Sequence, residues 1–346
     1  MISTGAMRTG RIVLGFTTML ALSVPFAAAQ DSERAYYAGK TVRFVVGFGA
    51  GGGYDSYARM LAPYLAKNLG ANVIVENRPG AGGLVALNGL YIAPPDGLAI
   101  MITNGTGAAF SQLTNLAGAR YDLRKIGYVA TLSAPPSVWT VSPQSGIKTI
   151  AAALKSGRRW QWAASGPVDS LSDGAAFTCA GLKLDCKIVL GYKGSNDSAL
   201  AVARGEMDAL YVTDTSANNY VRSNGLVSLA TMGRNRSRFF RDLPTIFEAV
   251  KLNADQEWLF NFRHVVQSLG RILVTPPGLS DSRLKFLEAA TAKALNDPIF
   301  LAEGEKRQLY TDYVDAAGTR KNALSIVSTV TPAQRKLVQD ILAKAR

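Results

Sequence analysis

The segment from Thr41 to Gly83 limits the possible folds of this chain more than any other stretch. An apolar run over 41–46 predicts a β-strand, and the glycine-dense stretch Gly47–Gly53 follows it, leading into a helix that is expected to open at Asp55. A second strand and a second glycine turn, Pro79–Gly83, come next. Glycine at a strand-to-helix junction lets backbone N–H groups approach a ligand, and a helix N-terminus favours negative charge. The segment therefore predicts a site for an anionic group.

The same segment also fits a dinucleotide site. Gly47, Gly49 and Gly52 match the spacing G-x-G-x-x-G between a strand and a helix, and Glu76 lies 24 residues beyond Gly52. In dinucleotide-binding folds, an acidic residue at about this distance binds the ribose hydroxyls. An oxidoreductase that uses the Gly47–Gly52 turn is therefore one alternative.

The N-terminus has the pattern of a secretory signal peptide. Arg8 and Arg11 precede an apolar run over Ile12–Phe26, and Ala27–Ala29 resembles a cleavage site. Small and polar residues within the run make it a poor permanent membrane span. We expect a signal peptide over residues 1–29, cleavage before Gln30, and a periplasmic location.

Length and charge bound the class of protein. Without residues 1–29 the chain keeps 346 − 29 = 317 residues, a length that usually divides into two domains. The formal net charge of +13 favours anionic partners. The basic residues are scattered, and their densest cluster, over Arg234–Arg241, matches no known nucleic-acid motif. The sequence therefore does not indicate a nucleic-acid partner.

The two cysteines, Cys179 and Cys186, are the only ones in the chain. In an oxidising compartment we expect them to form a disulfide across a short helix-to-strand connection, which would stabilise the fold by about 2–3 kcal/mol. Two buried free thiols are the alternative. The chain offers too few ligands at suitable spacing for a structural metal site.

Strands and helices are expected to alternate along the chain, which predicts an α/β fold with largely parallel sheets. The further strands are expected at Leu98–Ile102, Trp160–Ala164, Lys187–Leu190, Met207–Val212 and Leu226–Met232. The helices are expected near Leu171–Ala180, Asp197–Ala203, Ser216–Asn224, Asp281–Leu295, Pro298–Leu309 and Thr331–Ala345.

Catalytic residue types are scarce. His264 is the only histidine, and its surroundings, Phe262–Val266, suggest a strand or strand edge in which it serves packing or hydrogen bonding. No two acidic residues are spaced as an acid–base pair. The sequence therefore predicts neither an enzyme nor a cofactor. It offers instead many strand-end turns rich in small polar residues, which in open α/β sheets converge on a ligand.

Several phrases, in this order, resemble the substrate-binding proteins of tripartite tricarboxylate transporters, also called Bug proteins. They are Val42–Val46, Gly51–Arg59, Asn72–Gly83, Pro95–Gly97, Tyr192–Gly194, Gly205–Asp208 and Leu243–Glu248. The resemblance implies a type II periplasmic binding protein, with two α/β domains around a ligand cleft and a hinge. It places residues 36–141 and 259–346 in the first domain and 142–258 in the second.

The resemblance also implies a site for a small carboxylate. The residues expected to line it are Gly49, Gly51, Gly52, Tyr54, Asp55, Gly82, Gly83, Asn104, Ser133, Ser165, Gly166, Pro167, Tyr192, Lys193, Gly194 and Asp214. Among them Asp55 is expected to cap its helix and fix the first loop, with binding of a polar group of the ligand as the alternative. Lys193 is the best candidate for a direct charge contact. Glu76 and Arg78 would brace the second loop.

Two questions stay open at this point. Asp169 and Asp173 stand where the family commonly has a histidine, and either carboxylate could contact an amine or hydroxyl of the ligand. The expected partners are the membrane subunits of a tripartite tricarboxylate transporter, which would receive the ligand from a monomeric receptor. A sensor ectodomain with no role in transport is a further alternative.

Overall fold

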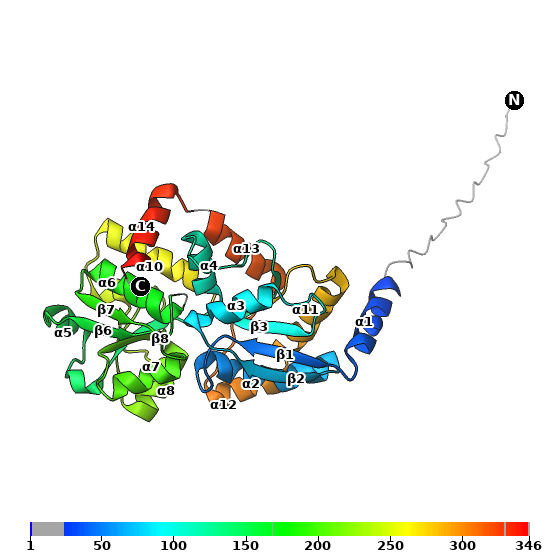
Figure 1. Ribbon diagram of the computed structural model, residues 1–346, viewed down its shortest axis with the longest axis horizontal. Helices are drawn as coiled ribbons and strands as arrows, with labels where there is room; N and C mark the ends of the chain where they lie inside the picture. Colours follow the sequence, from blue (N-terminus) through cyan, green and yellow to red (C-terminus); the bar gives the residue numbers. More distant parts are fainter. Residues whose placement is uncertain (2–23, 168, 329, 345–346) are drawn as a thin grey trace.

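The computed structural model describes residues 1, 24–167, 169–328 and 330–344. Two β-sheets, each covered by helices on both faces, form two lobes that lie side by side (Figure 1). The first sheet has the order β11-β4-β10-β3-β1-β2 and the second has the order β7-β6-β8-β5-β9. This is the α/β architecture that the sequence predicts.

The strands of the first sheet are β1 (Thr41–Val46), β2 (Asn72–Asn77), β3 (Ala99–Asn104), β4 (Gly127–Ser133), β10 (Arg271–Thr275) and β11 (Val314–Asp315). Those of the second are β5 (Ser137–Val141), β6 (Trp160–Ala163), β7 (Cys186–Val189), β8 (Ala209–Thr213) and β9 (Val227–Thr231). Strand β1 is parallel to β2 and β3, and β6 is parallel to β7 and β8. Strand β10 is antiparallel to β3 and β4, as β5 is to β8 and β9.

The sequence patterns did not predict β4, β5 or β10. Strands β4 and β5 are joined by Ala134–Pro136 and belong to different sheets, so the chain crosses between lobes there. The expected domain limits stay a prediction, and this sheet membership favours a first crossing at 134–136, several residues before the expected limit at 141.

The helices of the first lobe lie on two faces of its sheet. One face carries α2 (Gly53–Leu69), α11 (Asp281–Leu295) and α12 (Pro298–Arg307). The other carries α3 (Leu84–Tyr91), α4 (Gly105–Leu113), α13 (Ala316–Ser328) and the short helix η1 (Ala81–Gly83). Helix α1 (Val24–Tyr37) packs on α11, where Glu33 pairs with Arg283.

The second lobe is built in the same way. Helices α6 (Ser170–Leu182) and α10 (Ala254–Gln267) lie on one side, and α7 (Ser195–Ala203) and α8 (Asp214–Asn224) on the other. The shorter elements are η2 (Pro143–Ser145), α5 (Ile150–Lys155) and α9 (Ile246–Ala249). The C-terminal helix α14 (Pro332–Ala343) packs on α6.

A cluster of aromatic rings connects the lobes. Phe110 of α4 stacks on Phe177 of α6 with 5.3 Å between the ring centroids, and both rings contact Phe262 of α10. These residues share one hydrophobic core with residues of α3, α13 and α14. The two lobes are therefore joined by apolar packing as well as by the chain crossings.

The expectation that His264 lies on a strand is wrong. His264 belongs to α10, which starts at a capping box formed by Asn253 and Gln256. The run Phe262–Val266 looks like a strand because it is rich in aromatic and β-branched residues. The buried residues of α10, however, recur at helical spacing. His264 is half-buried, and burial, followed by the charges of Arg234 and Arg263, lowers its pKa.

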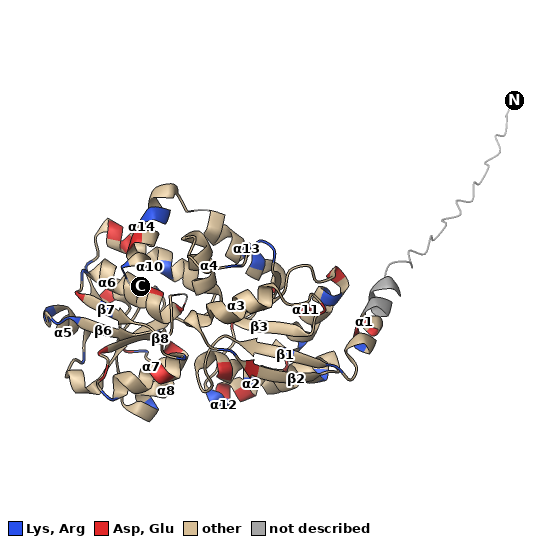
Figure 2. Cartoon of the chain, viewed as in Figure 1, with Lys and Arg blue, Asp and Glu red and all other residues tan. Residues whose placement is uncertain are grey.

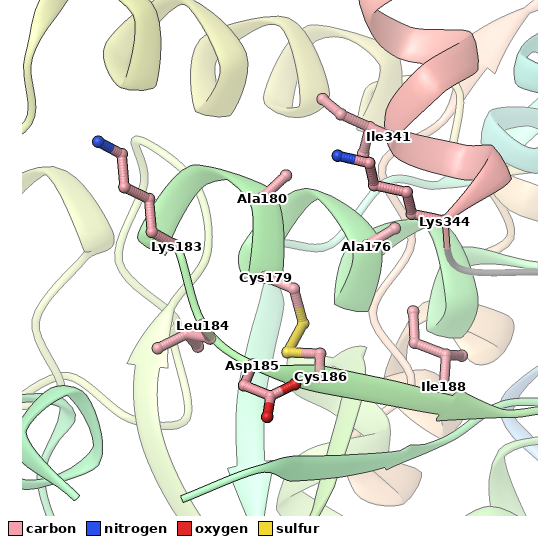
Figure 3. Close-up of a pocket in the computed structure, with 10 residues that line it drawn as sticks. All are labelled: Ala176, Cys179, Ala180, Lys183, Leu184, Asp185, Cys186, Ile188, Ile341 and Lys344. Atoms are coloured by element: carbon pink, nitrogen blue, oxygen red, sulfur yellow. A yellow bond between two sulfur atoms is a disulfide. The ribbon is translucent and has the colours of Figure 1, made fainter. Parts of the chain in front are cut away.

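A disulfide joins Cys179 of α6 to Cys186 of β7. It lies in a surface pocket that Ile341 and Lys344 border from the α14 side (Figure 3). This pocket contains none of the predicted ligand residues.

Residues 2–23 and the side chains of residues 24–29 lie outside the described residues, and with them most of the predicted signal peptide. In the described part of the chain, no helix combines the length and apolarity needed to cross a bilayer. Figure 2 shows that basic and acidic residues are interspersed over both lobes. In the Arg234–Arg241 cluster, Arg234, Arg236 and Arg238 each form an ion pair with an acidic residue.

Candidate functional site

The helix N-termini of both lobes meet at the carboxyl ends of the strands. Helices α2, α4, α6, α7 and α8 each follow a strand directly or after a short turn, and their first residues lie at the boundary between the lobes. Free N–H groups and the positive ends of helix dipoles favour negative charge. The boundary between the lobes is therefore suited to an anion.

The first glycine loop contacts the second lobe directly. The Gly49 N–H donates a 2.8 Å hydrogen bond to the carbonyl oxygen of Lys193. Gly52 lies against Ser195, and Gly194 packs against Phe48 and Gly49. The lobes are thus in contact along this part of the boundary, and Lys193 contributes its backbone to it while its side chain is exposed.

Asp55 organises the first loop from inside the first lobe. Its carboxylate accepts hydrogen bonds from the Gly51 N–H at 2.9 Å, from Asn77 Nδ2 at 2.9 Å and from Arg59 Nε at 3.0 Å. Burial alone would raise the pKa of Asp55, but these three donors outweigh it and the pKa is lowered. The expectation that Asp55 caps α2 is wrong, because Gly52 occupies the cap position and has no side chain. The second expectation, that Asp55 fixes the loop, agrees with these hydrogen bonds.

The second glycine loop meets the turn after β6. A Cβ atom added to Gly166 would overlap the backbone of Ala81 and Gly82. Gly82 and Gly83 have positive φ angles of 69° and 94°, which favour glycine. The two turns therefore need glycine on both sides of their contact. Pro167 follows directly, at the edge of this contact.

Tyr54, Asn104 and Ser170 lie near this contact. Ser170 Oγ, at the start of α6, donates to Asn104 Oδ1 at 3.1 Å, which links the two lobes. The Tyr54 ring stacks on Phe48 with 4.5 Å between centroids. Loss of water around the Tyr54 hydroxyl raises its pKa to about 12, so it stays protonated at neutral pH and can donate a hydrogen bond.

The two acidic residues at the start of α6 are engaged within the protein. Asp169 caps α6 by accepting from the Ser172 N–H at 2.7 Å, and it accepts from both the N–H and the Oγ of Ser165. Burial raises the pKa of Asp169. Asp173 forms a buried ion pair with Arg263 at 2.7 Å. These partners make a structural role the better account of both carboxylates.

Ser133 accepts a hydrogen bond from an arginine that the sequence patterns did not identify as a site residue. Arg271, the first residue of β10, donates from Nη1 to Ser133 Oγ and from Nη2 to Thr213 Oγ1, both at 3.1 Å. Ser133 belongs to the first sheet and Thr213 to the second. The signal available in the sequence was a charged residue at the start of the strand-like segment Arg271–Thr275.

Three predicted site residues remain, Asp214, Tyr192 and Gly51. Asp214 Oδ2 accepts from Ser237 Oγ at 2.9 Å, and burial raises the Asp214 pKa. The Tyr192 N–H donates to the carbonyl oxygen of Ala164 within the second lobe, and Gly51 faces Asn196 at an open pocket on the boundary. Glu76 and Arg78 form an exposed ion pair beside the second loop.

The structure gives little support to the dinucleotide alternative. Of the amides in the G-x-G-x-x-G stretch, that of Gly49 is bonded to Lys193 and that of Gly51 to Asp55. Glu76 is paired with Arg78. These groups have internal partners in place of a pyrophosphate and a ribose.

Comparison with known proteins identifies the family. The model of the tripartite tricarboxylate transporter family receptor matches residues 57–323. The chain is 26% identical over 281 residues to a UPF0065 protein of Bordetella pertussis, a match that covers 79% of this chain and 82% of that protein.

Solved structures show the same fold. The periplasmic binding protein BugD has a TM-score of 0.72 at 21% identity, over 88% of this chain and 98% of that one. MatC from Rhodopseudomonas palustris with bound malate has a TM-score of 0.71 at 20% identity, over 88% and 99%. Since the family model covers most of the sequence, the chain belongs to the tripartite tricarboxylate transporter receptor family.

Proposed function

We propose that this protein is an exported receptor that captures a small organic carboxylate between its two lobes and delivers it to the membrane subunits of a tripartite tricarboxylate transporter. The observation that carries the proposal is the convergence of helix N-termini from both lobes on one boundary. Malate in the related MatC structure is consistent with this ligand class. The site residues expected from the sequence are proposed as its lining, with Asp55 as a brace.

The proposed mechanism is a population shift. Ligand contacts from both lobes exist together only when the lobes are closed, so binding favours closure. The closed contacts between Gly49 and Lys193 and between Gly166 and Gly82 are of the kind that such a state requires. We further propose that residues 1–29 are removed on export and that the receptor works as a monomer.

A thermal-shift screen of residues 30–346 tests the proposal. The panel holds small carboxylates including malate, amino acids and dinucleotides. A ligand at 100 times its Kd adds about 2.7 kcal/mol of apparent stability, which corresponds to a shift of several degrees. Shifts with organic acids are expected, and a shift with a dinucleotide alone would return the Gly47–Gly52 turn to the oxidoreductase alternative. Binding to the detergent-solubilised membrane subunits distinguishes a transport receptor from a sensor ectodomain.

A further inference from the structure

Arg271 occupies an unusual position for a charged residue. It begins β10, which lies between β3 and β4 inside the first sheet, where it is paired with Asn104 on one side and Ser133 on the other. Only 3% of Arg271 is exposed. Its guanidinium reaches the end of the sheet where the loops of both lobes meet, as its bond to Thr213 shows.

The partners of this guanidinium do not neutralise its charge. Ser133 and Thr213 are neutral acceptors, and Arg271 Nε is buried without a hydrogen-bond partner. Within the described ranges, no carboxylate lies at ion-pair distance from Arg271. Burial raises the pKa of Asp214, and the nearby charge of Arg271 opposes this rise in part. The Asp214 carboxylate accepts its hydrogen bond from Ser237.

A second deeply buried arginine provides the contrast. Arg263 is 1% exposed, and Asp173 neutralises it at 2.7 Å. Leaving a buried charge without a counter-ion costs stability, and proteins usually pair such charges. Arg271 is therefore a buried charge without a counter-ion among the described residues, as expected if a bound ligand supplies the counter-ion.

Close packing around Arg271 limits the geometry with which such a partner can approach it. The Tyr54 and Tyr57 rings lie 5.3 Å and 4.6 Å from the guanidinium carbon, which partly compensates the charge by cation–π attraction. A Cβ atom added to Gly53 would come within 3.0 Å of Arg271 Nη2. The first residue of α2 thus brings its backbone close to the arginine.

We propose that Arg271 is the direct charge partner of the ligand and makes the site selective for a free acid group over its neutral amide. This inference rests on the proposed function and replaces Lys193 as the direct charge contact. A carboxylate accepts two hydrogen bonds from a guanidinium in a fixed geometry. An amide at the same place would leave the Arg271 charge uncompensated.

Isothermal titration calorimetry tests the inference on residues 30–346. The probes are malate, succinate and adipate, each beside its monoamide and diamide. For the acid with the lowest Kd, we expect the wild type to bind the acid at least about 100-fold more tightly than the weaker-binding of its two amides. This ratio needs no variant, and a ratio near one would overturn the inference.

Arg271→Gln and its matched control, Arg263→Gln, locate the selectivity. Arg271→Gln should weaken acid binding by about 100-fold, leave amide binding within about threefold, and keep or raise the melting temperature without ligand. Arg263→Gln should lower the melting temperature and preserve the acid-to-amide ratio. Equal acid affinity in Arg271→Gln and the wild type would overturn the role of Arg271 while the receptor function stands. No binding of any acid by the wild type, with a shift from a dinucleotide, would overturn both.

Discussion

The Gly49 amide hydrogen and the Lys193 carbonyl oxygen join two loops that are 144 residues apart in the sequence, with 2.8 Å between nitrogen and oxygen. Backbone groups of the two lobes thus bond to each other at the edge of the proposed site. A ligand that favours this closed arrangement adds to contacts the protein already makes. The predictions below examine the closure and the parts of the structure that support it.

Gly166→Ala should impair closure. The added methyl group would overlap the Ala81–Gly82 backbone, so the lobes must separate to make room for it. A cost of about 1.4 kcal/mol for closure weakens binding tenfold, and we expect at least that loss for the acid identified by the screen. Small-angle X-ray scattering should show a larger radius of gyration.

Gly89→Ala is the matched control for that substitution. Gly89 lies within α3, and nothing lies within 4 Å of an added Cβ. Affinity and radius of gyration should stay at the wild-type values. If Gly166→Ala behaved like Gly89→Ala, the contact between the two glycine turns would not control closure.

Asp55→Asn should change how stability depends on pH. The pKa of Asp55 is lower in the folded protein than its ordinary value of 3.8, so its contribution is fully present above that value. The contribution is lost as the pH falls through the lower, folded-state pKa. Urea unfolding should find the variant less stable by about 1–3 kcal/mol at pH 7. That difference should shrink below about pH 4. A difference that stayed constant down to about pH 2 would contradict this account.

Removing the disulfide should destabilise the protein without altering the ligand site. The bond closes a short loop between α6 and β7, so replacing both Cys179 and Cys186 by serine should cost about 2–3 kcal/mol. A reducing agent should lower the stability of the wild type by a similar amount and leave the double variant unaffected. Ligand affinity should not change, because the pocket beside the disulfide is separate from the loops.

Asp173→Ala should be severely destabilising. It would leave Arg263 buried without its counter-ion, and breaking a buried pair from one side typically costs about 3–5 kcal/mol. Chemical denaturation measures the loss. If Asp173 instead served the ligand, the variant would keep its stability and lose affinity.

The sequence predicted the elements whose signals are local. Glycine after an apolar run marks the junction between β1 and α2 because glycine permits the tight turn, and Asp281–Leu295 is a helix with the limits expected from its apolar stripe. Strands β5 and β10 were missed because each depends on partners distant in the sequence. Arg271 was missed for the same reason, since its importance comes from Ser133 and Thr213, which only the fold brings together.

The predicted site residues divide along a similar line. Glycines 49, 82 and 166 lie where the loops touch, as positions chosen for close backbone approach should. For Asp55, Asp169 and Asp173, the sequence alone does not show whether the carboxylate contacts a ligand or another residue of the protein. Their internal partners, Asn77, Ser165 and Arg263, become visible only in three dimensions.

The aromatic cluster of Phe110, Phe177 and Phe262 has a consequence for the heat-capacity change of ligand binding. A rotation of the lobes that keeps these rings packed separates surfaces made mainly of amides, hydroxyls and glycine. The heat-capacity change of association reports chiefly on apolar surface removed from water. A large movement between the lobes would then contribute only a small heat-capacity change. Small-angle scattering would reveal a closure that the heat-capacity change alone would not.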